Sequence, residues 1–476
     1  MPEILYIILG VIALFILIIL FKAIMFNEKI DKNLYVKKEV DDQVVNELCK
    51  LIKFKTISYQ DKKEIDFELF QKYIDTVKEM YPLVFNKCEF KQTEEYAIYL
   101  KLKGKNNNNP TVLLAHYDVV PVSDEWDYDP FLGEVVNNSV YGRGAVDTKC
   151  TMVAALRALE NALKNDYVPN NDLYLCFGSN EEVYGDSQIK IVEKLKKEGV
   201  KPALVFDEGG GITTNAFPGV KEDTAFLGVV EKGMVNYKLS ITYPGGHSST
   251  PKKNGPTVQM AKAIAKLENN PMKPRFTKTT KELVNIMGRH TIFLLKIVFA
   301  NMWLFKGLVK KLFANISTDT KALVTSTFAF TTIHGGTVTN SIPEYVEANI
   351  NVRIAPFDTK EKVLEHIKKT INNENIKVEM CEANKMYKEC DYNSVGYKKI
   401  KDTVLKTYDN VVVAPFITFG GTDARHYNEI SDCVIRFSPI KLTSEERKGM
   451  HGVNEQISVE AVKKALIFYE NLLEIL

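Results

Sequence analysis

The stretch Leu173-Tyr-Leu-Cys-Phe-Gly-Ser-Asn-Glu-Glu182 is an apolar run that ends in two adjacent glutamates. A second run, Thr111-Val-Leu-Leu-Ala-His-Tyr-Asp118, ends in a histidine and an aspartate, and a third, Ala203-Leu-Val-Phe-Asp207, ends in an aspartate. Such runs, separated by amphipathic stretches, predict buried strands of a mostly parallel α/β sheet. Because open α/β sheets bind ligands where their strands end, these side chains should gather at one edge. Imidazole and carboxylate groups suit a zinc-like divalent ion.

The composition bounds the class of protein. A length of 476 residues predicts two folded units plus an appendage, because a single core rarely grows so large. The net charge of +2 and the lack of a basic stripe with interleaved aromatics argue against a nucleic-acid partner. The seven cysteines form no CxxC pair, which argues against zinc-finger spacing and a disulfide framework.

The N-terminus carries an unbroken apolar run over residues 4–21, and about 20 helical residues suffice to cross a membrane. No basic segment precedes the run and no small-residue cleavage site follows it, so an anchor is favoured over a cleaved signal peptide. We therefore predict a single-pass transmembrane anchor within residues 1–30. The lysines that follow the run are Lys22, Lys29, Lys32, Lys37 and Lys38. By the positive-inside rule they favour a cytoplasmic location for the catalytic part.

The hydrophobic spacing predicts a catalytic domain built from two separated segments, residues 40–234 and 388–476. Residues 235–387, between them, predict the order β-α-β-β-α-β, which is the ferredoxin-like split motif. We interpret this segment as an inserted α+β lid domain and as a surface for homodimer formation. Residues 105–110, which include four consecutive asparagines, predict a polar turn before the first ligand-bearing strand.

Residues 291–313 interrupt the inserted segment with an apolar, aromatic-rich stretch that contains four lysines. Four lysines argue against a second membrane span. One interpretation is a helical pair that packs on the sheet of the lid. The other is an interfacial or substrate-covering surface for apolar ligands.

Six short motifs in a fixed order resemble those of the M20 metallopeptidases, which include aminoacylase, carboxypeptidase and dipeptidase relatives. In chain order they are His116-Tyr-Asp118, Gly142-Arg-Gly-Ala-Val-Asp-Thr-Lys149, Glu181-Glu182, Asp207, Gly246-His-Ser-Ser-Thr-Pro251 and His451. Asn301-Met-Trp-Leu-Phe305 and His334-Gly-Gly-Thr-Val-Thr-Asn-Ser-Ile-Pro343 are similar to the carboxypeptidase S and N-acyl-amino-acid hydrolase branch. Each motif alone is weak, whereas six in order are specific. The resemblance runs from about residue 45 to the C-terminus and implies a zinc-peptidase-like fold.

The resemblance implies two divalent metal ions, with zinc preferred and cobalt or manganese as alternatives. The implied ligands are His116 and Asp207 at one ion and Glu182 and His451 at the other, with Asp147 shared. Glu208 is an alternative to Asp207, because the two residues follow the same apolar run.

The resemblance also implies three catalytic residues. Asp118 would fix the imidazole of His116, Glu181 would act as the general base, and His247 would stabilise the oxyanion. The alternative interpretations are a solvated surface turn for the glutamate pair and a turn with a helix cap for the segment around His247.

The motif Gly420-Gly-Thr-Asp-Ala-Arg425 resembles the substrate-gripping loop of the family. Gly420 and Gly421 would allow close backbone approach, and Arg425 would hold a carboxylate through two parallel hydrogen bonds. Asn340 and Arg353 are further substrate-binding candidates; their alternative roles are a turn cap and an ordinary charge at the end of a strand.

These expectations combine into a membrane-anchored di-zinc hydrolase that cleaves a peptide or N-acyl amide bond next to a free carboxylate. The alternative is an N-fatty-acyl-amino-acid hydrolase or synthase, which the anchor and the apolar insertion favour weakly. A non-catalytic binding protein of the same fold is disfavoured, because every implied ligand and the base are present. Ester or carbamoyl hydrolysis would fit the same site.

Overall fold

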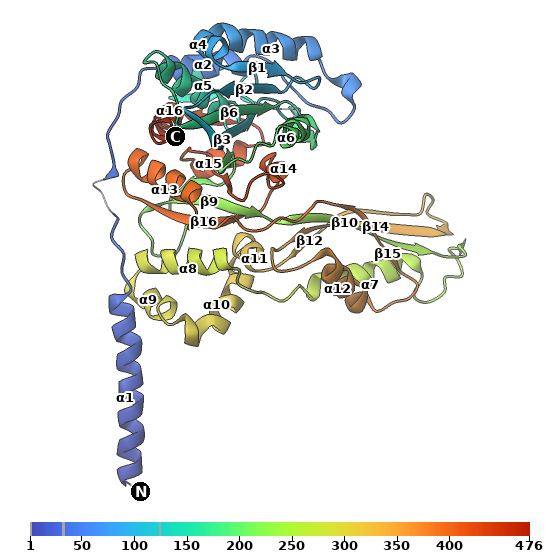
Figure 1. Cartoon of the computed structure of the whole chain (residues 1–476). Helices are drawn as coiled ribbons and strands as arrows, with labels where there is room; N and C mark the ends of the chain where they lie inside the picture. Colours follow the sequence, from blue (N-terminus) through green and yellow to red (C-terminus); the bar gives the residue numbers. More distant parts are fainter. Residues whose placement is uncertain (1, 31–33, 123–124) are drawn as a thin grey trace. The chain divides into compact units, whose positions relative to one another are not determined.

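The computed structural model describes residues 2–30, 34–122 and 125–476 (Figure 1). Met1 and Lys32, which belong to the predicted anchor and its flanking lysines, lie outside the described residues. The chain divides into two compact units. The larger unit consists of Ile24–Val229, Ile286–Lys296 and Cys390–Leu476, and the smaller unit of Met1–Ala23, Val230–Asn285 and Ile297–Glu389.

A nine-stranded mixed sheet forms the centre of the larger unit. Its strands are β1 Glu89–Gln92, β2 Ile98–Leu102, β3 Asn106–His116, β6 Asn171–Gly178, β7 Leu204–Asp207, β8 Gly211–Thr213, β9 Asp223–Glu231, β16 Val411–Thr418 and β17 Val434–Arg436. Their order is β1-β2-β6-β3-β7-β17-β9-β16, and β8 pairs with β9. The pairs β6·β3, β3·β7 and β7·β17 are parallel, whereas β1·β2, β2·β6 and β17·β9 are antiparallel. The prediction of a mostly parallel sheet is therefore correct only for the centre of the sheet.

Helices cover both faces of this sheet. Successive residues of a strand point to opposite faces, so neighbouring residues of one strand show which helices lie on each face. The helices are α2 Gln43–Ile52, α5 Lys149–Leu163, α6 Ser187–Lys197, α13 Val395–Thr407, α14 Ala424–Tyr427 and α16 Val459–Leu473. Leu113 of β3 belongs to a core cluster with α2, α5, α13 and α16. Its neighbour Leu114 belongs to a separate cluster with α6 and α14. The larger unit is thus a three-layer α/β/α structure.

The larger unit contains further helices and a second, smaller sheet. They are α3 Phe67–Met80, α4 Pro82–Lys87, α15 Ser444–Gly449 and a three-stranded sheet of β4 Glu134–Val136, β5 Ser139–Tyr141 and β18 Gln456–Ser458. The asparagine run at 106–109 belongs to β3, so the prediction of a polar turn there is wrong. Asn106 pairs with Asn171, and the register then shifts before Thr111 pairs with Leu173. Asn109 has a φ of 50°, a conformation that asparagine tolerates better than most residues, so the run forms an irregular, exposed extension of the strand.

The smaller unit contains a four-stranded antiparallel sheet with two helices packed against it. Its elements are β10 Gly233–Thr242, α7 Pro256–Asn269, β12 Thr327–Gly335, β14 Tyr345–Ile354, α12 Lys360–Ile371 and β15 Lys377–Ala383. The spatial order β12-β14-β10-β15 places the first strand between the third and the fourth, which is the split β-α-β-β-α-β arrangement. Alternate residues of β10, namely Val235, Tyr237 and Leu239, form the core with α7 and α12.

Four helices lie between α7 and β12 in the sequence. Two short strands, one after β10 and one between β12 and β14, form a separate ribbon. The helices are α8 Lys278–His290, α9 Phe293–Phe299, α10 Met302–Ile316 and α11 Thr318–Val324, and the ribbon pairs β11 Gly246–His247 with β13 Ser341–Ile342. The apolar stretch 291–313 therefore forms two helices, α9 and α10.

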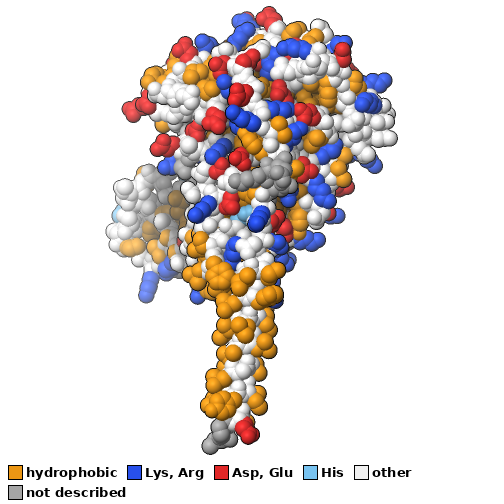
Figure 2. All heavy atoms as spheres, turned by 90° about the vertical axis from the view of Figure 1, so that its left-hand side faces the viewer, with side chains coloured by type: hydrophobic (Ala, Val, Ile, Leu, Met, Phe, Trp, Pro, Cys, Tyr) orange, Lys and Arg blue, Asp and Glu red, His pale blue; other side chains and the backbone are white. Residues whose placement is uncertain are grey.

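The N-terminal helix α1 (Pro2–Met25) is apolar and exposed along most of its length. Figure 2 shows hydrophobic side chains along its visible face. Within the described part of the chain, it is the one helix whose length and composition suit a membrane span, over Glu3–Met25.

Candidate metal centre

Three neighbouring parallel strands, β6, β3 and β7, bring three of the predicted ligands to one edge of the sheet in the larger unit. In the register of β3 with β6, His116 lies opposite Gly178, so the pair Glu181-Glu182 follows β6 at the same level. On the other side of β3, strand β7 ends at Asp207. Polar side chains that follow adjacent parallel strands necessarily meet at the carboxyl edge, as the sequence predicts.

Asp147 lies between two histidines that are far apart in the sequence. Its Oδ1 is 3.1 Å from Nε2 of His116, and its Oδ2 is 3.0 Å from Nε2 of His451. Nε2 of His451 is also 3.0 Å from Oε2 of Glu182. Two ligand atoms that each lie about 2.1 Å from one tetrahedral ion are about 3.4 Å apart, so these separations suit metal coordination.

The charges of the cluster also fit divalent cations. Burial raises the pKa of Glu182, and it raises the pKa of Glu208 to about 8, with a further contribution from the negative charge of Asp147. At Asp147, the hydrogen bonds from His116 and His451 outweigh burial and lower the pKa. Divalent cations here would balance the buried carboxylates, so the donor set fits metal ions.

Glu208 and Asp207 point to different partners. Oε1 of Glu208 lies 3.2 Å from Nε2 of His116, and the ligand atoms of Glu208, Glu181 and His116 all lie within 4.8 Å of one another. Oδ2 of Asp207 instead accepts a hydrogen bond from the backbone N–H of Ala424 at 2.9 Å. The structure thus brings the alternative residue of the pair, Glu208, to His116.

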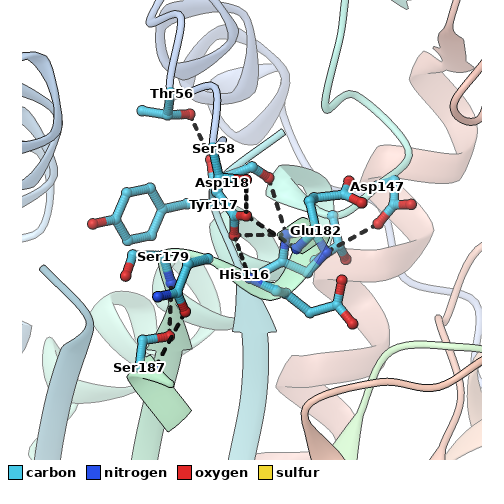
Figure 3. A network of polar contacts seen from close by, with 12 residues as sticks. Thr56, Ser58, His116, Tyr117, Asp118, Asp147, Ser179, Glu182 and Ser187 are labelled. Carbon is cyan, nitrogen blue, oxygen red and sulfur yellow. Dashed lines mark hydrogen bonds and ion pairs between the residues drawn. The ribbon is translucent and has the colours of Figure 1, made fainter. Parts of the chain in front are cut away.

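Asp118 is fully buried and fixes the orientation of His116 (Figure 3). Its carboxylate accepts hydrogen bonds from the backbone N–H groups of Glu181 at 3.2 Å and Glu182 at 3.1 Å, and from the hydroxyl of Ser58 at 2.7 Å. Its Oδ1 lies 3.3 Å and its carbonyl oxygen 3.0 Å from Nδ1 of His116. These acceptors place the proton on Nδ1 and leave the lone pair of Nε2 for a metal ion. No sequence pattern indicates the contribution of Ser58.

Glu181 lies within the same cluster but differs from Glu182 in its surroundings. Burial raises its pKa well above the usual range, and the nearby carboxylates of Asp423 and Glu208 raise it further against the charge of His116. A buried carboxylate with a raised pKa is suited to accept and return a proton at neutral pH.

Glu455 ties the loop of Asp147 to the loop of His451, and sequence reasoning missed it. Its side chain is fully buried and accepts hydrogen bonds from four groups. The donors are the N–H groups of Gly144 at 3.1 Å, Val146 at 2.8 Å and Asp147 at 3.2 Å, and Nη1 of Arg143 at 2.7 Å. Arg143 also donates to the carbonyl of Gly452 at 2.7 Å. A single glutamate in a polar loop carries no sequence pattern that would predict this role.

Lys149, the last residue of the Gly142–Lys149 motif, forms hydrogen bonds with the end of a helix and the loop after it, not with the residues of the cluster. Its buried Nζ donates to the carbonyls of Leu51 at 3.2 Å and Phe54 at 2.9 Å, at the C-terminal end of α2. Burial lowers its pKa to about 7.

The predicted substrate-gripping loop follows β16. Gly420 is exposed and Gly421 is partly exposed, whereas Arg425, in α14, is buried. The guanidinium of Arg425 lies 5.2 Å from the ring centroid of Tyr184. Its Nη1 has no hydrogen-bond partner among the residues that the structure describes. A buried guanidinium nitrogen in this state is a candidate partner for a substrate carboxylate.

In the smaller unit, the β11·β13 ribbon brings His247 close to Asn340. His247 pairs with Ser341, and the N–H of Ser248 donates to the carbonyl of Asn340 at 3.1 Å. Nδ1 of the exposed His247 accepts a hydrogen bond from the N–H of Ser249 at 3.2 Å. The proton of a neutral His247 therefore resides on Nε2, which makes that nitrogen a donor.

Arg353 does not join this ribbon. It lies near the C-terminal end of β14, eight residues after Tyr345, which corresponds to about 27 Å along the strand. It pairs there with Met234 of β10 and Thr327 of β12.

Sequence comparison identifies relatives over most of the chain. Residues 112–475 match the sequence profile of peptidase family M20/M25/M40. The relative named "Probable carboxypeptidase S-like 2" of Dictyostelium discoideum is 30% identical over 443 residues, which cover 91% of this chain and 85% of the relative. The N-fatty-acyl-amino acid synthase/hydrolase of Xenopus tropicalis is 31% identical over 439 residues, with the same coverage of 91% and 85%.

Two solved structures share the fold. An M20 family metallo-carboxypeptidase from Sulfolobus solfataricus superimposes with a TM-score of 0.68 at 22% identity, over 92% of this chain and 99% of that chain. A dinuclear metal binding peptidase of the M20 family from Bacillus subtilis gives 0.57 at 14% identity, over 91% and 99%. The resemblance inferred from the six motifs is confirmed. The chain belongs to peptidase family M20/M25/M40 and is a hydrolase that acts on amide bonds.

Proposed function

We propose that the chain is a membrane-anchored dinuclear metallohydrolase that cleaves a peptide or N-acyl amide bond next to a free carboxylate. The observation that carries this proposal is the position of Asp147, with one oxygen at His116 and the other at His451. A carboxylate shared between two sets of ligands would hold two ions close together, as in two-metal hydrolytic sites. The free carboxylate is suggested by the carboxypeptidase S-like relative.

Two sets of residues would hold the ions. They are His116, Asp147 and Glu208 for one ion, and Asp147, Glu182 and His451 for the other. Zinc is preferred for this mixture of nitrogen and oxygen ligands, with cobalt or manganese as alternatives. When bound, such ions polarise a substrate carbonyl and lower the pKa of water. Asp207 would support the loop at Ala424 instead of binding an ion.

Glu181 would be the general base. Its carboxylate would take a proton from the attacking water and later deliver it to the nitrogen of the leaving amine. Burial, which raises its pKa, supports this exchange at neutral pH. Asp118 would act through His116, because it keeps the proton on Nδ1.

Each unit carries residues that we propose for substrate binding. Arg425 would pair with the carboxylate of the substrate, and Gly420 and Gly421 would let the backbone approach it. We assign residues 235–387 the role of a lid and homodimerisation domain, which would present Nε2 of His247 as a donor to the oxyanion. Asn340, beside His247, and Arg353 are proposed substrate-binding residues of the same domain.

A test of this proposal is Glu181→Gln, with Glu193→Gln on the exposed side of α6 as the matched control. We expect Glu181→Gln to keep its metal content while turnover falls by about 10²–10⁴-fold. Elemental analysis and steady-state kinetics would measure the two quantities. Unchanged turnover would remove Glu181 from the role of base, and loss of metal would make it a ligand.

The second candidate is hydrolysis or synthesis of N-fatty-acyl amino acids. The Xenopus tropicalis relative bears that activity in its name. In addition, α10 exposes apolar side chains that suit a substrate with a long acyl chain. Both reactions use the same groups on an amide bond. Comparison of a short dipeptide with a long-chain N-acyl amino acid, assayed on one preparation, would decide between them.

We also propose that α1 is a single-pass anchor and that the catalytic part lies on the cytoplasmic side, as the lysines after the span favour. Resistance of the full-length chain to carbonate extraction would test the anchor. Release of the chain by carbonate would contradict it.

A further inference from the structure

Helix α10 contacts α1 within the smaller unit. The ring of Trp303 lies 5.8 Å from the ring of Phe15 in an edge-on arrangement, and Nζ of Lys22 lies 5.4 Å from the Trp303 ring centroid. Nδ2 of Asn301 donates to the carbonyl of Ile19 at 3.1 Å. Phe15 and Lys22 are separated by about 10 Å along the helix axis. Trp303 therefore lies between the charged end of α1, at Lys22, and its apolar part, and tryptophan is enriched at membrane–water interfaces.

One face of α10 is apolar and exposed. Leu304, Leu308 and Leu312, spaced four residues apart, form a row on this face and are 44%, 51% and 44% exposed. Val309 and Phe313, on another side of the helix, are buried in the unit. Single exposed leucines are common on protein surfaces and need no explanation. A row of them along one helix face forms a contiguous apolar patch, and such a patch marks an interaction surface.

A basic cavity adjoins the same helix. It has a volume of about 580 Å³, and two of its basic side chains, Lys310 and Lys311, belong to α10. The others are Lys273, Arg275 and Lys321. Its described lining contains no acidic side chain. This combination of an apolar row and a basic cavity on one short helix matches an anionic amphiphile better than an uncharged acyl chain or an apolar protein surface.

We propose that α10 docks onto an anionic lipid bilayer beside the anchor. The row Leu304, Leu308 and Leu312 enters the acyl region, Trp303 lies at the interface, and the basic cavity holds an anionic lipid headgroup. The inference rests on the proposed anchor, because the contacts with Phe15, Ile19 and Lys22 set its depth. It adds a second, lipid-selective attachment to a chain that a single helix would otherwise only tether.

The chain contains two tryptophans, Trp126 and Trp303, so fluorescence can report on α10 in the full-length protein. We would reconstitute the chain into phosphatidylcholine–phosphatidylserine vesicles in which one lipid carries brominated acyl chains, which quench tryptophan on contact. Trp303→Phe supplies the signal of Trp126 for subtraction. We expect brominated lipid to quench the Trp303 signal at least about twofold, as for an interfacial side chain.

Headgroup selectivity tests the basic cavity. Brominated phosphatidylserine should compete for Trp303 about fivefold better than brominated phosphatidylcholine, since one basic side chain near an anionic surface has an effect of this size. Lys310→Gln/Lys311→Gln should reduce this preference towards one. Lys362→Gln/Lys368→Gln on the exposed side of α12 is the matched control and should keep it.

The outcomes separate this inference from the proposed anchor. Flotation with the vesicles but no quenching of Trp303 would leave the anchor intact and overturn the docking of α10. Equal quenching by both brominated lipids would overturn the anionic headgroup site. A Trp303 emission that shifts with protein concentration but not with lipid would assign the leucine row to a second copy of the chain and overturn the proposal. Failure to float would overturn the anchor and the inference together.

Discussion

The metal cluster of the larger unit and the His247 ribbon of the smaller unit are both assembled from residues distant in the sequence, but they are held in different ways. Asp118, at the cluster, is fully buried and accepts three hydrogen bonds from Ser58, Glu181 and Glu182. His247, on the ribbon, is exposed, and its partner Ser249 is two residues away.

This difference separates the proposed metal binding from the proposed oxyanion stabilisation. A preorganised, buried cluster couples metal affinity to the stability of its unit, because each ligand depends on groups behind it. An exposed ribbon supplies a donor that the fold does not need. Substitutions of the proposed metal ligands and of the groups that orient them should therefore change metal content and stability together, whereas substitutions in the ribbon should change turnover alone.

The largest effect is expected where the cluster offers two adjacent acids. Glu208→Gln should lose one of two bound ions and lower turnover by about three orders of magnitude, because a metal ion contributes several kcal/mol of charge stabilisation. Asp207→Asn should keep both ions, since its side chain can still accept the hydrogen bond from Ala424. Elemental analysis of both variants measures this difference. The reverse result would assign the ligand role to Asp207, as the family resemblance implies.

On the ribbon, His247→Ala should lower turnover by about 10²–10³-fold, the usual cost of removing one oxyanion donor. Metal content and melting temperature should stay at the wild-type values. His366→Ala is the matched control, because His366 lies in the same unit and contacts the carbonyl of Asn270 instead. A His247 variant that also loses metal or stability would break the contrast between ribbon and cluster.

Glu455→Gln tests how far the hydrogen bonds that orient the Asp147 loop contribute to metal affinity and stability. Glutamine cannot satisfy four donors, and Arg143 would lose its charged partner. We expect a 10–100-fold lower metal affinity, as for other groups that orient ligands, and a loss of about 3 kcal/mol in the free energy of unfolding. Metal titration and denaturant unfolding would measure the two effects. Unchanged metal affinity would reduce Glu455 to a purely structural role.

These residues also show which features of the fold can be predicted from the sequence. The ends of β3, β6 and β7 are predictable, because apolar runs mark buried strands and the polar residue that follows each run marks its end. The antiparallel outer strands β1 and β2 are not, since a buried run looks the same whichever way its neighbour runs.

Side-chain roles are predictable only where a motif fixes them. Asp118 is recognised by its spacing from His116, whereas Ser58 and Glu455 reach the cluster through folding over long sequence separations. The choice between Asp207 and Glu208 depends on how the backbone turns after β7, which the sequence does not specify.

The smallest expected effect concerns Lys232, a buried group of the smaller unit away from the ribbon residues. Its Nζ donates to the carbonyls of Ala322 at 3.2 Å and Thr325 at 2.9 Å and to the hydroxyl of Thr327 at 3.2 Å. Burial lowers its pKa to about 7, and the charge of Arg353 contributes. Among the described residues of the smaller unit, Lys232 is where we expect the pH-dependent behaviour of a buried charge to be measurable.

The sign of the pH effect follows from the direction of the shift. Between pH 7 and 10 the unfolded chain, with a lysine pKa of about 10.4, binds more protons than the folded chain, so stability rises with pH. From pH 7 to pH 8 the gain is about 1 kcal/mol. Lys232→Met should remove this gain, and the difference between the melting temperatures of variant and wild type at each pH cancels titrations elsewhere. Parallel pH profiles would mean that the three acceptors keep Lys232 charged, and that the smaller unit, like the cluster, compensates its buried charge.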